Sequence, residues 1–148
     1  METLPDVTVT VPNGTPLRLR EQSLPLVVYF YPKDDTTGCT REAVDFSALV
    51  SEFAAAGVVV LGISKDSPKK HEKFIAKYDL AVPLASDEDG AACEAFGTWV
   101  EKSMYGRSYM GIERATFLFG RDGKLAREWR KVKVAGHAAA VLEAARTL

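Results

Sequence analysis

One cysteine in this sequence stands where a side chain can be activated as a nucleophile. Cys39 follows a stretch of turn residues and opens a pattern typical of a helix. If Thr36 is the N-cap of that helix, Cys39 is its third residue, and the threonine oxygen accepts a hydrogen bond from the Cys39 amide. Free amides and the positive end of the helix dipole favour a thiolate there. We expect a reactive thiolate, with a small buried apolar residue as the competing interpretation.

The elements that must position Cys39 alternate between strands and helices. Leu26 to Tyr31 is a short β-branched and aromatic run, typical of a buried strand. From Cys39 onward apolar residues recur at spacings of three and four until Gly57, which indicates an amphipathic helix. Further strands are expected at Val58 to Ile63, Val82 to Leu84, Ala115 to Phe119 and Leu125 to Trp129. Further helices are expected from Ser67-Pro68 onward, at Asp87 to Phe96 and after Gly136. Val7 to Val11 and Leu17 to Leu19 are expected to form an N-terminal hairpin. This order predicts an α/β sandwich around a mixed sheet, with Cys39 at the edge where open α/β sheets bind ligands.

Length and composition limit the classes of protein to which the chain can belong. Its 148 residues contain no linker or repeat, so we expect a single domain over residues 1–148. A formal charge of −1 argues against a nucleic-acid partner. The N-terminus lacks the features of a signal peptide, and no apolar run approaches the roughly 20 residues of a membrane helix. We therefore expect a cytoplasmic protein without a membrane partner, whose two cysteines are reduced thiols.

The residues around Cys39 also form a specific motif. Pro32, Thr36 and Cys39 fit the pattern P-x-x-x-T-x-x-C, which resembles the peroxidatic loop of peroxiredoxins. The flanking residues resemble the Q-type branch, also called bacterioferritin comigratory protein, and so do the segments 83–87, 96–99 with 101–102, and 111–117. The resemblance implies a thioredoxin-like three-layer sandwich with a central mixed sheet. It also implies a thiol-dependent peroxidase that reduces hydrogen peroxide and organic hydroperoxides through a sulfenic acid.

The resemblance assigns expected roles to individual residues. Cys39 would be the peroxidatic cysteine, Thr36 the hydroxyl that contacts peroxide and thiolate, and Pro32 the shield of the pocket. Arg114 would orient both reactants, and Glu42 would be a supporting polar group. Attack on an O–O bond builds negative charge on the leaving oxygen, so a fixed guanidinium accelerates the step. Without the resemblance, Arg114 would be interpreted as a solvated surface residue.

The chain departs from the pattern of its relatives at two kinds of position. Thr37 stands where many relatives have proline before the Gly-Cys pair. The two positions at which relatives place a resolving cysteine hold Val44 and, approximately, Ile75. Cys93 remains, and we expect it to be buried and inert rather than resolving, because a disulfide would require two helices to open. An external thiol, either a thioredoxin-like protein or a small thiol, is then the expected reductant, and the resemblance favours a monomer.

Several other functions compete with a peroxidase. A thioredoxin-like disulfide reductase would need C-x-x-C, and Thr36 occupies the first cysteine position. A non-catalytic redox module or holdase would have the same fold without peroxide chemistry. His71 and His137 are expected to be surface groups, so we expect no metal and no cofactor. Four lysines are expected to form a solvated face: Lys69, Lys70, Lys73 and Lys77. Four residues of the loop before Arg114 are expected either to wall the pocket or to pack in the core: Trp99, Tyr105, Tyr109 and Met110.

Overall fold

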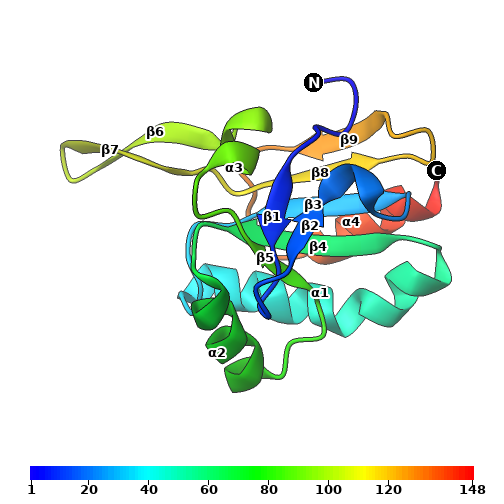
Figure 1. Ribbon diagram of the computed structural model, residues 1–148, viewed down its shortest axis with the longest axis horizontal. Coiled ribbons are helices and arrows are strands. Elements are labelled where there is room, and N and C mark those ends of the chain that lie inside the picture. The colour runs from blue at the N-terminus through cyan, green and yellow to red at the C-terminus, as the bar shows by residue number, and fades with distance from the viewer.

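A mixed seven-stranded sheet forms the centre of the molecule in the computed structural model, which describes all 148 residues (Figure 1). The strand order is β2-β1-β5-β4-β3-β8-β9. The three central strands, β3 (Leu26–Phe30), β4 (Val59–Ser64) and β5 (Leu84–Ser86), run parallel. On one side of them β8 (Ala115–Phe119) and β9 (Leu125–Trp129) add antiparallel strands. The predicted mixed sheet is therefore confirmed.

The sheet separates two apolar cores. All five residues of β3 are buried, and their side chains alternate between the two faces. Val27 and Tyr29 belong to one cluster of buried side chains, whereas Leu26, Val28 and Phe30 belong to the other. A strand that is apolar on both faces is typical of a sheet covered on both sides.

Helices cover the two faces unequally. The first core contains residues of α1 (Thr37–Ala55), α2 (Pro68–Tyr78) and α4 (His137–Arg146). The second core is covered by the short α3 (Ala91–Ala95) and by N-terminal residues that include the 3-10 turn η1 (Leu19–Glu21). Figure 1 shows α1 and α2 on one side of the sheet and α3 on the other. These layers form the expected thioredoxin-like sandwich. None of the helices has both the length and the apolar composition that a membrane span requires.

The N-terminal hairpin is present and extends the sheet. It consists of β1 (Thr8–Thr10) and β2 (Pro16–Arg18), and β1 joins β5 through the pair Thr10 and Ser86. The helix expected at residues 87–96 is shorter than predicted, since only Ala91–Ala95 is helical. The reason is that Asp87 acts from outside the helix, where its carboxylate accepts the amides of Ala92 and Cys93 at 2.9 and 2.8 Å.

The segment predicted as a loop before Arg114 is a two-stranded ribbon. Strands β6 (Trp99–Met104) and β7 (Arg107–Ile112) pair antiparallel and project from the body of the molecule (Figure 1). Their two-residue turn places Tyr105 and Gly106 at φ angles of 52° and 77°, the left-handed geometry that tight hairpins require. The prediction of a loop was wrong because the ribbon is largely exposed and carries no strict apolar alternation. Its second strand ends two residues before Arg114.

Candidate active site

Cys39 lies at the start of α1, directly after the loop that leaves β3. Thr36 is the N-cap residue, with extended backbone angles of −98° and 158°, and Cys39 is the third helical residue as predicted. Its side chain is 2% exposed and packs in the first core with Ala43 and Phe46. Cys39 is therefore both a helix N-terminal thiol and a buried residue, so the two interpretations of the sequence do not exclude each other.

The Thr36 side chain does not make the expected capping bond. Its hydroxyl donates to the Lys33 carbonyl oxygen at 2.9 Å, and no side chain caps the amides at the start of α1. That carbonyl lies three residues upstream in the same loop, and the hydroxyl is oriented toward it rather than toward the Cys39 amide. The expected bond to the Cys39 amide is thus wrong. The consequence is that the amides of the first turn remain available to an anionic or polar ligand.

Arg114 connects Cys39 to a buried carboxyl group. It immediately precedes β8, whose Ala115 pairs with Phe30, so it emerges at the same end of the sheet as the Cys39 loop. Its Nη2 lies 3.3 Å from the Cys39 sulfur, and its Nη1 donates to Glu42 Oε1 at 2.7 Å. The side chain is only 17% exposed, so the interpretation as a solvated surface arginine is wrong.

Glycine at position 38 permits this close approach. A Cβ added there would lie 3.2 Å from Nη2 of Arg114, closer than an ordinary van der Waals contact. The guanidinium therefore packs directly against the backbone of the first turn of α1. This contact fixes the position of the guanidinium relative to Cys39.

Glu42 supplies the negative partner of the guanidinium. It lies one turn after Cys39 on the same face of α1 and is almost fully buried. Burial raises the pKa of Glu42 to about 7, although the charge of Arg114 acts in the opposite direction. Burial would lower the pKa of Arg114, but Glu42 and Cys39 outweigh it and raise that pKa above its usual value. Arg114 therefore stays charged, while Glu42 changes its charge near neutral pH.

Pro32 and Thr36 frame the loop in front of Cys39. Both residues are exposed, Pro32 at the first position after Tyr31 and Thr36 at the last position before the helix. The structure thus brings four of the expected site residues to one strand-to-helix connection: Pro32, Thr36, Cys39 and Glu42. Arg114 joins them from the neighbouring strand.

Cys93 lies apart from this site. It is fully buried in the second core together with Phe96, so the sheet stands between it and Cys39 in the first core. Burial, followed by the nearby Asp87 carboxylate, raises the pKa of Cys93 to about 12. Both cysteines are free. The predicted buried setting is confirmed, and its thiol keeps its proton at neutral pH.

Both histidines are buried, contrary to the sequence-based expectation. His71 is inaccessible, and His137 bonds through Nε2 to the Thr116 hydroxyl at 2.7 Å. Burial, with a smaller contribution from Arg114, lowers the pKa of His137 to about 4, so it is neutral at pH 7. The burial of His71 has a signal in the sequence, because it precedes Phe74 and Ile75 at helical spacings of three and four.

Lys102 is a functional candidate that sequence reasoning did not find. It extends from β6 and is half-buried, and its pKa is lowered by burial and by Arg114. It thus brings a second cation into the field of Cys39. Of the four residues expected either to wall the pocket or to pack in the core, Trp99 packs against the second core, and Tyr105 is 97% exposed at the tip of the ribbon. The four lysines of α2 are exposed, as predicted.

Known proteins place the chain in a family. Residues 1–128 match the AhpC/TSA family model. The chain is 52% identical to a peroxiredoxin Bcp of Xanthomonas campestris over 94% of this chain and 88% of that protein. It is 44% identical to the peroxiredoxin Bcp of Bacillus subtilis over 94% of this chain and 89% of that protein.

The fold of the chain also matches solved structures of similar proteins. A structure of the bacterioferritin comigratory protein of X. campestris, which addresses the alkyl peroxide reduction activity of that protein, superimposes with a TM-score of 0.90 at 50% identity, covering 96% of this chain and 91% of that one. None of these relatives supports the alternative of a non-catalytic redox module or holdase. The chain therefore belongs to the AhpC/TSA family, and within it to the Q-type peroxiredoxins, which are thiol-dependent peroxidases.

Proposed function

We propose that Cys39 is the peroxidatic nucleophile and that Arg114 activates it together with the peroxide. The proposal depends on the position of the Arg114 guanidinium. Its Nη2 lies 3.3 Å from the Cys39 sulfur, and its Nη1 donates to Glu42 Oε1 at 2.7 Å. The thiolate sulfur attacks the terminal oxygen of the hydroperoxide, the S–O bond forms and the O–O bond breaks. Cys39 becomes a sulfenic acid, and the leaving alkoxide or hydroxide takes up a proton to give an alcohol or water.

The surrounding groups act on the charge that moves in this step. Negative charge develops on the leaving oxygen, and Arg114 with the uncapped amides of α1 provides fixed donors for it. The Thr36 hydroxyl donates its own hydrogen to the Lys33 carbonyl, which leaves its oxygen lone pairs free to accept the peroxide O–H. Pro32, which is exposed at the start of the loop, shields Cys39 from water. Glu42 keeps the guanidinium oriented.

The proposed substrates are hydrogen peroxide and organic hydroperoxides, including the alkyl peroxides reported for the X. campestris relative. Recycling requires an external reductant, either a thioredoxin-like protein or a small thiol, and not Cys93. The support is that Cys93 is buried in the other core and keeps its proton. The first thiol condenses with the sulfenic acid to a mixed disulfide and water, and a second thiol then releases the Cys39 thiol.

The proposal includes the setting in which the enzyme works. We place it in the cytoplasm as a single-domain monomer without cofactor, nucleic acid or membrane partner. Two free thiols in one chain fit a reducing compartment. The near-neutral net charge of −1 fits the lack of a polyanionic partner.

The test compares two cysteine variants that differ only in which thiol they remove. Wild type and Cys93→Ala should each consume one equivalent of hydrogen peroxide without added thiol, and a sulfenic-acid trap should label both. Cys39→Ser should consume none and remain unlabelled. Rapid-mixing peroxide assays and intact mass spectrometry provide the two readouts. Peroxide reduction by Cys39→Ser at the wild-type rate would contradict the proposal.

A further inference from the structure

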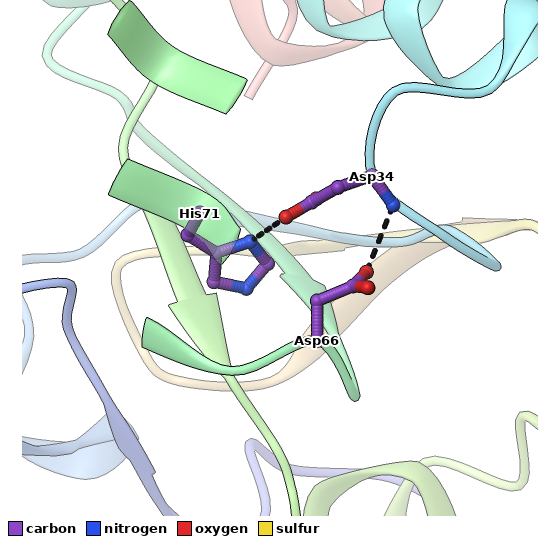
Figure 2. A group of neighbouring side chains, drawn as sticks. All are labelled: Asp34, Asp66 and His71. Carbon is purple, nitrogen blue, oxygen red and sulfur yellow. Dashed lines mark hydrogen bonds and ion pairs between the residues drawn. The ribbon is translucent and has the colours of Figure 1, made fainter. Parts of the chain in front are cut away.

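A buried polar cluster holds the loop in front of Cys39. It consists of Asp34 from the loop, Asp66 from the connection between β4 and α2, and His71 from α2 (Figure 2). The Asp34 carboxylate lies 2.6 Å from His71 Nδ1, and the Asp34 amide donates to the Asp66 carboxylate at 2.8 Å. The other imidazole nitrogen, Nε2, lies 3.0 Å from the Ala85 carbonyl oxygen of β5. The loop is thereby attached to both α2 and the sheet.

The hydrogen bonds assign the protons in this cluster. A carbonyl oxygen only accepts, so His71 Nε2 must carry a hydrogen. The Asp34 carboxylate accepts a second hydrogen bond from the Tyr31 hydroxyl at 2.6 Å. His71 Nδ1 faces the other oxygen of this carboxylate, so His71 and Asp34 share a short buried hydrogen bond. Such a buried contact is costly to break on one side, because the remaining polar group has no partner.

The same bonds exclude a metal ion as the purpose of the cluster. The Asp66 oxygen nearest the Asp34 amide also accepts the Ser64 hydroxyl at 2.7 Å, and both Asp34 oxygens accept hydrogen bonds. A cation would have to displace these donors. The adjoining cavity also carries more lysines than acidic residues, since Lys33, Lys70, Lys73 and Lys77 line it beside Asp34, Asp35 and Asp66. The cluster therefore acts on the protein's own loop.

The next residue of the loop is attached to α2 as well. Asp35 has a φ of 58°, in the left-handed region, and its carboxylate accepts from Lys77 at 2.7 Å and from the Tyr78 hydroxyl. The Asp35 contacts are exposed, whereas the His71 contact is buried. An exposed ion pair contributes little, so the buried pair is the stronger attachment.

This attachment matters for the reduction of oxidised Cys39. The Cys39 side chain is 2% exposed, so a thiol cannot reach a sulfenic acid formed there unless the loop and the first turn of α1 open. Opening moves the loop residues away from α2. The energy of the Asp34–His71 contact therefore opposes opening.

Given the proposed role of Cys39, we propose that His71 is a positioning residue that clamps the peroxidatic loop through Asp34. The clamp keeps the loop closed while Cys39 reacts with peroxide, and its strength sets how often the loop opens to admit the reducing thiol. His71 touches neither reactant. It acts only on the equilibrium between the closed and open loop.

Matched substitutions at His71 separate its two hydrogen bonds. The amide nitrogen of His71→Gln can reach the position of Nε2 and keep the bond to Ala85, but it leaves Asp34 without a donor. The amide nitrogen of His71→Asn can take the position of Nδ1 and retain the bond to Asp34. Tyr31→Phe removes the other donor to the same carboxylate without opening a cavity. Val141→Ala, in the first core on α4, is the control for a loss of stability away from the loop.

Two measurements read the clamp. In His71→Gln, amide hydrogen exchange over residues 33–40 should accelerate by about tenfold or more, the loss expected for one charge-assisted hydrogen bond. Reduction of the Cys39 sulfenic acid by thionitrobenzoate should accelerate by a similar factor, while the peroxide step changes by less than about twofold, because the closed loop still predominates. Tyr31→Phe should shift both rates in the same direction, and His71→Asn should remain near wild type.

Different outcomes would contradict the proposed clamp and the proposed function. Unchanged amide exchange and thiol rates in both His71→Gln and Tyr31→Phe would overturn the clamp, as would equal acceleration of both rates in Val141→Ala. A wild-type protein that forms no sulfenic acid at Cys39 would refute the proposed function. Hydrogen exchange would still measure the clamp in that case, since it does not depend on the reaction.

Discussion

At the scale of single residues, the site depends on where one guanidinium is held. Arg114 donates to a buried carboxyl group with one nitrogen and contacts the Cys39 sulfur with the other. Neither contact requires a titratable group on the donor side, because arginine keeps its proton. Lysine would provide a single ammonium at the end of a flexible chain and could not hold both partners in this planar arrangement.

Arg114→Ala should slow the peroxide step by about 10²- to 10³-fold, the usual effect of removing one preorganised transition-state donor. The fold should persist, because burial already raises the pKa of Glu42 and the carboxyl group can take a proton when its partner is lost. Stopped-flow oxidation measured per folded molecule tests this prediction. Arg146→Ala, which removes surface ion pairs to Glu52 of α1 and Glu143 of α4, is the control and should oxidise normally. If Arg114→Ala unfolded more readily but kept its rate constant, Arg114 would be a structural residue only.

At the scale of elements, the sheet keeps the two thiols apart. Cys39 belongs to the core under α1, and Cys93 belongs to the core under α3. A disulfide needs Cα atoms about 4.4–6.8 Å apart. Joining the two residues would require α1 to unwind and α3 to leave its core, so we expect no intramolecular disulfide.

After one equivalent of peroxide, intact wild-type protein should gain one oxygen and should not lose two hydrogens. Excess peroxide should add a second oxygen, giving an inactive sulfinic acid, since no neighbouring thiol intercepts the sulfenic acid. Cys93→Ala should give the same masses and the same turnover with a small thiol or with thioredoxin. Quantitative loss of two hydrogens in wild type, together with failure of Cys93→Ala to turn over with thioredoxin, would identify Cys93 as the resolving residue.

Helices and strands can be predicted from the sequence where their apolar spacing and capping residues determine them. The strand before the loop and α1 could be predicted because their apolar spacing matches the faces they bury, and Ser67 caps α2 by accepting the Lys70 amide as its position suggests. The ribbon β6–β7 could not, because its residues face mostly solvent. The Thr36 hydroxyl was assigned a wrong partner because a rule for N-caps does not reveal that this side chain is oriented toward the Lys33 carbonyl. Contacts between distant elements, such as Asp34 with His71, require the tertiary structure.

At the scale of the whole molecule, two buried groups near Arg114 affect stability with opposite dependence on pH. The pKa of Glu42 rises from 4.5 to about 7 on folding, so its contribution is full below pH 4.5 and is lost as the pH rises to 7. The pKa of His137 falls from 6.5 to about 4, so its contribution is full above pH 6.5 and is lost as the pH falls to 4. Over the range they share, the two effects oppose each other.

Glu42→Gln should therefore change the pH profile of stability as well as its level. Between pH 4.5 and 7 the wild-type free energy of unfolding should fall relative to that of Glu42→Gln, by about 3 kcal/mol for a shift of this size. The variant alone should become more stable as the pH rises, because only the His137 contribution remains. Urea unfolding at several pH values provides the measurement, with Glu52→Gln on the exposed part of α1 as the control. Parallel profiles for wild type and Glu42→Gln would show that Glu42 is ionised throughout this range.

The placement of the two cysteines in separate cores has a consequence for the working life of the enzyme. In the proposed cycle each oxidised molecule waits for a thiol from solution, and a second peroxide competes with that thiol for the same sulfur. The mean number of turnovers before inactivation is then a ratio of two encounter rates. This number grows with the concentration of reductant and falls with the concentration of peroxide. The inactivated fraction of the enzyme therefore reports how far peroxide has exceeded the reducing capacity of the surroundings.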